Sequence, residues 1–432
     1  MAVSREQVLE YHLGGKIGLR LAKPLATLED LCLAYTPGVA IAVKEIHRDR
    51  EGLHRYTAKS NLVAVVSDGT AILGLGDLGA EASTPVMEGK AVLFKAFGDV
   101  DAWPMPLNQC RKDGKNTGPT DPQRVIDAVA AVAPLYGGIN LEDIAAPACF
   151  EIEDRLDAML DIPVFHDDQW GTAVITLAGV KNYGRLAERA PSELTVVING
   201  AGAAGTRICE MLKADGVKRI ILCDSKGVIR SDRKDLTPKK REHAVETSAR
   251  TVGEALKGAH VFIGVSVANC IKIGEIQSMA PYPAIFAMAN PDPEILPETV
   301  AAGMGGKPYV MATGRSDYPN QINNVLGFPF LFRGALDARA RTINIPMKLA
   351  AAEALAAVAR LPVPADVQAL YRDTPLTFGS GYIIPKPFDR RLFVEESCAV
   401  AEAAVKSGAA DAMDLSLYRQ MLESRNRERL SR

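Results

Sequence analysis

Short apolar runs alternate with polar and glycine-bearing segments along the middle of this chain. From residue 194 onward these runs are rich in β-branched residues, and helical or loop segments separate them. They occupy residues 194–198, 219–223, 260–265, 284–288 and 309–312. Strands of a parallel sheet have this pattern because crossover helices cover both of their faces. The pattern therefore predicts a doubly wound parallel sheet in this part of an α/β protein.

The first 165 residues mix strand-like and helical pieces less regularly. Residues 62–67 and 162–165 are short and apolar, as buried strands are. A glycine-rich stretch follows the first of them at 69–79. The polar, glycine-bearing segment 108–121 predicts an exposed loop.

Helical periodicity dominates the end of the chain, where residues 347–359 and 395–406 are rich in alanine. A chain of 432 residues is too long for a single core. We expect an N-terminal domain over residues 1–165, a doubly wound domain over 166–345, and a C-terminal helical segment over 346–432 that packs back on them.

Composition and charge exclude several classes of protein. The formal net charge is −2, so no large basic surface for nucleic acid is implied. The N-terminus lacks the build of a signal peptide, and no apolar run is long enough to span a membrane. The seven cysteines are scattered and form no Cys-x-x-Cys pair, which indicates reduced thiols in a cytosolic protein.

A glycine-rich turn, NGAGAAGT at 199–206, follows the first strand of the regular region. In the Gly-x-Gly-x-x-Gly pattern the first glycine makes the turn, the second admits a pyrophosphate, and the third lets helix and strand pack closely. Asp224 ends the next strand about 20 residues further on, which completes the dinucleotide pattern. The expected cofactor-binding residues of the turn are Gly200, Gly202, Ala203, Ala204 and Gly205.

The choice between NAD and NADP depends on the residues around Asp224. An aspartate there favours NAD, because its carboxylate accepts a hydrogen bond from the ribose 2′-hydroxyl. The basic residues that follow could equally hold the 2′-phosphate of NADP: Lys226, Arg230, Arg233 and Lys234. From these residues alone both cofactors stay open.

Two pairs of adjacent acidic residues, Glu142–Asp143 and Asp167–Asp168, are embedded in apolar sequence. Neighbours on a helix do not share a face, so such pairs serve one site only at a strand end or a turn. Four carboxylates there would repel each other without a hard cation, and oxygen ligands select Mg²⁺ or Mn²⁺. The alternative is that Asp168 caps a helix beginning near Gly171 and the first pair is a solvated turn.

Longer motifs run almost from end to end of the chain. They are AYTPGVA at 34–40, SDGTAILGLGDLG at 67–79, PVMEGK at 85–90, GINLEDIAAP at 138–147, FHDDQWGTA at 165–173, NGAGAAG at 199–205, MANPDPE at 288–294, ATGRSDYPN at 312–320, INNVLGFP at 322–329 and IPKPFD at 384–389. In sequence and order they resemble malic enzymes of the short bacterial type.

The resemblance implies an N-terminal substrate domain, a Rossmann-type dinucleotide-binding domain, and C-terminal helices that brace both. It implies oxidative decarboxylation of L-malate to pyruvate and CO₂ with reduction of NAD or NADP, in a homodimer or higher homo-oligomer. The segment DSKGVI at 224–229 resembles NADP-using relatives, so NADP is slightly favoured. The site is expected in the cleft between the domains.

The resemblance also implies roles for individual residues. They are Glu142, Asp143 and Asp168 as metal ligands, Tyr35 as general acid, Lys90 as general base, Asp167 as the carboxylate beside that lysine, and Asn290 and Asn324 on the substrate or nicotinamide side. Spacing alone makes Lys95 an equal candidate for the base. Lys90 can accept the proton of the malate hydroxyl if burial and a cationic neighbourhood lower its pKa.

The chain departs from the short type at three places. Loop 108–121 is longer, and a passive surface insertion is the favoured interpretation over a cover for the site or a subunit contact. Trp170 stands where a histidine is usual, which alters packing around Asp168. No room remains for the acetyltransferase-like domain of some relatives, so regulation by acetyl-CoA through it is not expected.

Two other functions stay open. A malolactic-type enzyme would use the same fold, keep its cofactor and release lactate. A non-catalytic nucleotide sensor would bind the dinucleotide without turnover, although the presence of Tyr35, Lys90 and all three candidate ligands argues against it.

Overall fold

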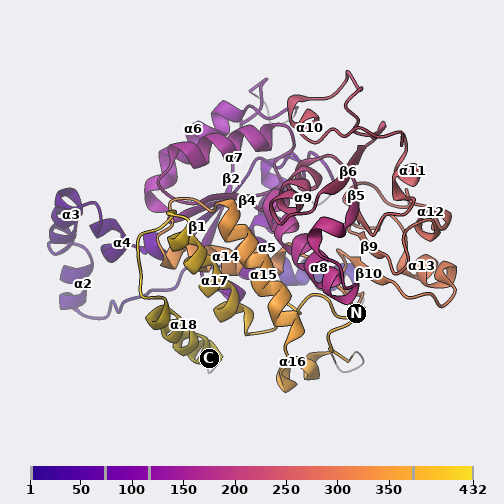
Figure 1. The fold of residues 1–432 in the computed structure, drawn as a ribbon. Helices are drawn as coiled ribbons and strands as arrows, with labels where there is room; N and C mark the ends of the chain where they lie inside the picture. Colours follow the sequence, from indigo (N-terminus) through magenta and orange to yellow (C-terminus); the bar gives the residue numbers. More distant parts are fainter. Residues whose placement is uncertain (1–2, 73–74, 115–117, 372–374, 431–432) are drawn as a thin grey trace.

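Two parallel sheets with helices around them form the framework of the protein (Figure 1). The structure is a computed structural model that describes residues 3–72, 75–114, 118–371 and 375–430. Parts of the glycine-rich stretch 69–79 and of loop 108–121 therefore lie outside the described residues. No described helix is long and apolar enough to cross a membrane. All seven cysteines are free thiols.

The first sheet has four parallel strands in the order β2-β1-β3-β4. Its strands are β1 (Leu62–Ser67), β2 (Asp101–Pro106), β3 (Gly138–Leu141) and β4 (Val164–His166), joined through α5 (Ala80–Gly98), α6 (Pro122–Val132) and α7 (Ala148–Met159). Strand order reverses between β1 and β3, and ligands bind at the carboxyl ends of strands at such a switch point. Strand β2 was not expected, because Pro104 and Pro106 obscure its pattern; prolines in strands are confined to edges.

The second sheet has the order β10-β9-β8-β5-β6-β7 and confirms the predicted parallel sheet. Its strands are β5 (Thr195–Asn199), β6 (Arg219–Asp224), the antiparallel β7 (Gly227–Val228), β8 (Val261–Gly264), β9 (Ala284–Ala287) and β10 (Val310–Thr313). Its helices are α9 (Ala203–Ala214), α10 (Pro238–Arg241), α11 (Val252–Leu256), α12 (Ile273–Gln277) and α13 (Pro297–Met304). Strand order reverses between β5 and β8, beside the glycine-rich turn.

Helices from the end of the chain return to both sheets, as expected. They are α14 (Phe328–Asp337), α15 (Ile345–Arg360), α16 (Ala365–Leu370), α17 (Leu392–Lys406) and α18 (Leu415–Leu430). In α8 (Thr172–Leu186), the Asn182 side chain donates to the carbonyl of Ala356 in α15 at 3.0 Å. In α18, Arg425 donates to Asp99, just after α5, at 2.7 Å. These contacts fix the position of one sheet relative to the other.

The first 51 residues lie largely outside this packing, and residues 3–51 are called the N-terminal arm here. The arm contains α1 (Arg5–His12), α2 (Leu28–Ala34) and α3 (Val39–Arg48), none of which buries a residue. In Figure 1, α2 and α3 form a lobe at the left with α4 (Gly52–Tyr56), apart from α5 and the sheets.

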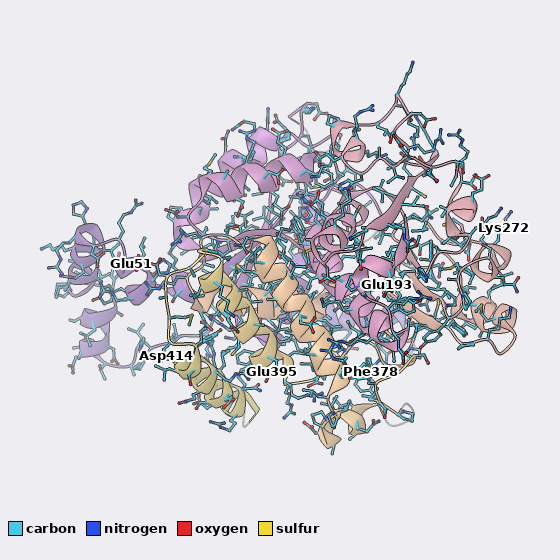
Figure 2. All side chains as sticks on the ribbon, in the orientation of Figure 1. Glu51, Glu193, Lys272, Phe378, Glu395 and Asp414 are labelled. Atoms are coloured by element: carbon cyan, nitrogen blue, oxygen red, sulfur yellow. The ribbon has the colours of Figure 1, made fainter. Side chains whose placement is uncertain are left out.

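One buried carboxyl group has no compensating partner. Glu396 in α17 is fully buried, and neither side-chain oxygen has a hydrogen-bond partner. Burial raises the pKa of Glu396 well above its usual value, so folding favours the protonated form of this group. Its neighbour Glu395, labelled in Figure 2, instead pairs with Arg419 at 2.8 Å and is partly exposed.

The Glu396→Gln variant should therefore be more stable than the wild type at pH 8. The folded chain binds one more proton than the unfolded chain above the usual glutamate pKa. Wild-type stability is thus full below that pKa and falls as pH rises, by up to about 1.4 kcal/mol per pH unit. Thermal unfolding between pH 5 and 8 should show the advantage of the variant growing with pH. Glu395→Gln serves as the control, and equal pH profiles for all three proteins would contradict the assignment.

Candidate active site

The two acidic pairs lie at the carboxyl ends of adjacent strands. Glu142 and Asp143 come directly after β3, and Asp167 and Asp168 directly after β4, which is hydrogen-bonded to β3. Single side-chain oxygens of Glu142, Asp143 and Asp168 lie within 4.8 Å of one another. The four carboxylates therefore gather at one edge of the first sheet, beside its switch point.

Backbone geometry holds these carboxylates in place. The Asp168 carboxylate accepts a hydrogen bond from the backbone N–H of Asp143 at 2.8 Å, and Asn140 donates to Glu142 at 3.0 Å. Asp143 has a left-handed backbone with φ of 53°, which aspartate tolerates better than most residues. Asp168 does not cap the following helix, because the N-cap of α8 is Gly171 and has no side-chain cap.

Lys90 is the cation that faces this cluster. It lies in the middle of α5, is 7% exposed, and places its Nζ 2.5 Å from Asp167 and 3.0 Å from Glu142. The ring of Phe328 lies beneath the ammonium group at 4.4 Å. Lys95 instead points outward and pairs with Asp99 and Asp101 near the surface. The structure thus separates the two lysines that spacing alone could not.

The charges at this edge do not balance within the chain. Burial acts to lower the pKa of Lys90, but the carboxylates of Asp167 and Glu142 outweigh it and raise that pKa. The expected lowering is therefore not present in the chain by itself. Burial also raises the pKa of Glu142, and raises that of Asp167 to about 6 despite Lys90. Three oxygen donors with excess negative charge fit a hard divalent cation.

A missing side chain makes room for Asp167. A Cβ atom at Gly171, the end of η3 (Asp167–Gly171), would lie 1.9 Å from Asp167 Oδ1, so any other residue there would displace the Asp167 carboxylate. The same Cβ would lie 3.0 Å from Cβ of Asn324, the first residue of η5 (Asn324–Leu326). Asn324 is therefore next to the carboxylate cluster. Asn290 lies in the exposed loop after β9.

The glycine-rich turn has the geometry that its pattern predicts. Gly200 has φ of 123°, and a Cβ there would meet the Val265 carbonyl at 2.4 Å. A Cβ at Gly205 would lie 1.7 Å from the Gly200 carbonyl, so only glycine lets α9 pack this close to β5. Around Gly202, the N-cap of α9, no atom lies within 4 Å of such a Cβ. Ala203 and Ala204 open the helix.

Asp224 at the end of β6 is already engaged by cations. Its carboxylate accepts from both terminal nitrogens of Arg233, at 2.8 and 3.1 Å, and from Lys240 at 2.8 Å. These hydrogen bonds outweigh its burial and lower the pKa of Asp224 to about 2. Lys226 is exposed and pairs with Asp235 at 2.9 Å. The sequence did not point to Lys240, because it lies beyond the basic segment that directly follows β6.

Tyr35 lies away from the carboxylate cluster of its own chain. It is the C-cap of α2, is 69% exposed, and belongs to the lobe that Figure 1 shows apart from α5. The structure therefore assembles the carboxylates, Lys90 and Asn324 within one chain, but not Tyr35.

Loop 108–121 is exposed along much of its described part, but it also contains buried residues. Arg111 is 2% exposed and donates to the carbonyl of Asp68 at 2.9 Å and the carboxylate of Asp77 at 2.8 Å. Thr120, also buried, donates to the Asp68 carboxylate at 2.5 Å. The expectation of an exposed loop is wrong for these two residues, because they bind Asp68, directly after β1, and Asp77, in the glycine-rich stretch 69–79.

This contact reaches the carboxylate cluster through residues 68–71. Asp68 accepts from Thr70 at 2.6 Å, and the Thr70 hydroxyl accepts from the backbone N–H of Ala145 at 2.8 Å. The N–H of Ala71 donates to the carbonyl of Asp143 at 3.0 Å. Loop 108–121 thus supports the backbone that carries a candidate metal ligand, and polarity alone gave no signal of this.

Fold and site together define a protein of two parallel sheets, one ending in a turn for a dinucleotide and the other in carboxylates for a cation. The malic enzyme N-terminal domain matches residues 15–157, and the malic enzyme NAD-binding domain matches residues 170–371. This chain therefore belongs to the malic enzyme family.

Relatives and a solved structure agree over nearly the whole chain. It is 51% identical to a probable NADP-dependent malic enzyme of Rickettsia prowazekii, across 98% of this chain and 55% of that protein. It thus spans about half the length of that relative. It is 49% identical to an NADP-dependent malic enzyme of Halomonas elongata, across 94% of each. The crystal structure of malic enzyme from Pyrococcus horikoshii matches with a TM-score of 0.84 and 41% identity, across 98% of this chain and 99% of that one.

The Arg111→Lys variant should bind Mn²⁺ more weakly than the wild type, by about tenfold or more. Lysine keeps the charge but loses the fork that reaches both Asp68 and Asp77, so the backbone at Asp143 is held less well. Titration calorimetry with Mn²⁺ measures the effect. The exposed neighbour Lys112→Arg is the matched control, and equal affinities in the two variants would show that the loop has no part in the site.

Proposed function

We propose that this protein is a cytosolic malic enzyme that converts L-malate to pyruvate and CO₂ with reduction of NADP. The observation that carries the proposal is the contact of Lys90 with Asp167 and Glu142, beside three carboxylates within 4.8 Å of one another. A buried lysine next to a cation site matches abstraction of a proton from a hydroxyl whose oxygen the cation holds. Seven free thiols support a reducing compartment.

In this proposal, Glu142, Asp143 and Asp168 hold Mg²⁺ or Mn²⁺. When bound, the cation polarises the C2 oxygen of malate and stabilises the charge left after C4 departs as CO₂, while NADP accepts the hydride from C2. Lys90 takes the proton of the C2 hydroxyl, and Asp167 holds the lysine in position. The negative charge of Glu142 stabilises the protonated form of Lys90, and it does so less strongly when Glu142 also binds a cation.

Three further residues act on the substrate in this proposal. Asn324, beside Gly171, orients the substrate from the carboxylate edge, and Asn290 does so from the nicotinamide side. Tyr35 returns a proton to C3, which gives pyruvate after the C3–C4 bond has broken. Protons then balance, because the one taken by Lys90 replaces the one that Tyr35 donates.

NADP is the cofactor that the surroundings of Asp224 favour. Its carboxylate is held by Arg233 and Lys240, so it has little capacity left to accept from a ribose hydroxyl. Two carboxylates, of Asp224 and Asp235, pair here with three cations: Arg233, Lys240 and Lys226. This leaves net positive charge at this edge of β6. A 2′-phosphate supplies the missing negative charge.

The working unit in this proposal is a homodimer in which the partner completes the site. Large apolar side chains of the N-terminal arm are exposed, among them Leu13 at 78%, Leu19 at 90% and Leu28 at 82%. An arm of this kind is stable in water only when another surface covers it. The arm leaves α5 after Lys16, which donates to Glu88 at 3.0 Å, and extends away with Tyr35 on it. A second copy therefore covers the arm and receives Tyr35.

The reaction should be visible as growth of absorbance at 340 nm with L-malate, Mn²⁺ and NADP, faster than with NAD, abolished by EDTA and matched by pyruvate. Lys90→Met should lower kcat by at least about 10²-fold, because general base catalysis is lost. Lys95→Met, which changes an exposed lysine of the same helix, should keep activity within about twofold. Full activity in Lys90→Met would exclude it as the base, and lactate without NADPH would indicate a malolactic enzyme.

Mixed dimers test the origin of Tyr35. Tyr35→Phe and Lys90→Met chains, each inactive alone, are co-expressed with different tags and purified as a heterodimer. If Tyr35 acts in the partner, one of the two sites has both residues intact, and activity should return to about half that of the wild-type dimer. If Tyr35 acts in its own chain, both sites stay broken and no activity returns. The two single-variant homodimers are the controls.

A further inference from the structure

A buried arginine connects the dinucleotide helix to the carboxylate cluster. Arg207 lies in α9, the helix that begins at the glycine-rich turn, and is 5% exposed. Its Nε donates to Gln169 at 2.8 Å, and its Nη2 donates to Glu153 at 3.2 Å. Its guanidinium group lies 4.4 Å from the ring of Trp170. One side chain of the second sheet's helix thus contacts η3, which carries Asp167 and Asp168.

Glu153 completes the network. It lies in α7, is buried, and accepts from the backbone N–H of His166 at 2.9 Å and from the Trp170 indole at 3.0 Å. These two residues flank the pair Asp167–Asp168 in sequence. Glu153 also accepts from Arg207, so hydrogen bonds through Glu153 connect η3 to α9.

Trp170 packs against the same network. Two cations contact its ring: Arg207 on α9, and Lys348 on α15, whose Nζ is 3.6 Å from the ring centre. Cations are attracted to the face of an indole, most strongly where water is excluded. The indole thus contacts one cation from the dinucleotide helix and one from α15.

We propose that Arg207 is a positioning residue through which dinucleotide and divalent cation favour each other's binding. The inference rests on the proposed function, because it assigns the cation to Asp168 and the dinucleotide to the start of α9. Arg207 and Glu153 link α9 to η3, so a ligand that holds one of these elements also holds the other in position for the second ligand. Coupling of this kind is reciprocal and needs no large movement.

Binding of Mn²⁺ to the intact enzyme, followed by the paramagnetic resonance signal of the free ion, tests the coupling with and without saturating NADP. Wild-type enzyme should bind Mn²⁺ at least about fivefold more tightly with NADP present. In Arg207→Met this ratio should fall below about twofold. Arg219→Met is the control, because it changes an exposed arginine at the start of β6 that donates to the carbonyl of Glu193 and belongs to the opposite end of the second sheet, so the wild-type ratio should persist.

A purely structural role for Arg207 would lower the thermal midpoint and leave the ratio unchanged, which would overturn the inference. Gln169→Leu removes one acceptor of Arg207 and should lower the ratio as well, which provides a second test if Arg207→Met does not fold. A wild-type ratio of one would also overturn the inference while leaving the proposed function intact. Wild-type enzyme that binds neither Mn²⁺ nor NADP would refute the proposed function itself, and the inference with it.

Discussion

Negative charge buried at one edge of the first sheet is the constraint on which the surrounding structure depends. Four carboxylates meet there, and Lys90 is the cation in direct contact with them among the described residues. Isolated charges of this kind are costly to remove from water. The neighbouring features reduce that cost: the backbone N–H of Asp143 donates to Asp168, and Gly171 leaves space for Asp167. The negative charge that Lys90 does not balance attracts a cation and so contributes to the free energy of binding it.

Features that depend on neighbours in sequence could be predicted. The glycine-rich turn is recognisable because each glycine answers a local steric demand, and Gly200 and Gly205 meet those demands in the structure. The acidic pairs were expected at strand ends because a helix cannot aim adjacent side chains at one point. Both pairs do lie at strand ends, and the five apolar runs of the second sheet are strands.

Features that depend on contacts between residues far apart in the sequence could not be predicted. Arg111 was assigned to an exposed loop on polarity, yet Asp68 and Asp77 bury it. Glu153 and Arg207 were not singled out at all, because each lies in an ordinary helical segment and they meet only in the fold. The separation of Tyr35 from Lys90 is likewise invisible in a motif, which records order along the chain and not the path between positions.

The two prolines of β2 have a consequence for the outer edge of the first sheet. Leu107, directly after β2, donates its backbone N–H inward to Ser67 of β1 at 2.8 Å. The backbone groups of successive strand residues point to opposite edges of the strand. The backbone nitrogens of Pro104 and Pro106 therefore point outward, and each lacks the N–H that another strand would need. At these two positions the outer edge offers acceptors without donors. An unrelated unfolded segment therefore pairs less readily with the sheet from this side, which reduces the edge-to-edge growth that leads to aggregation.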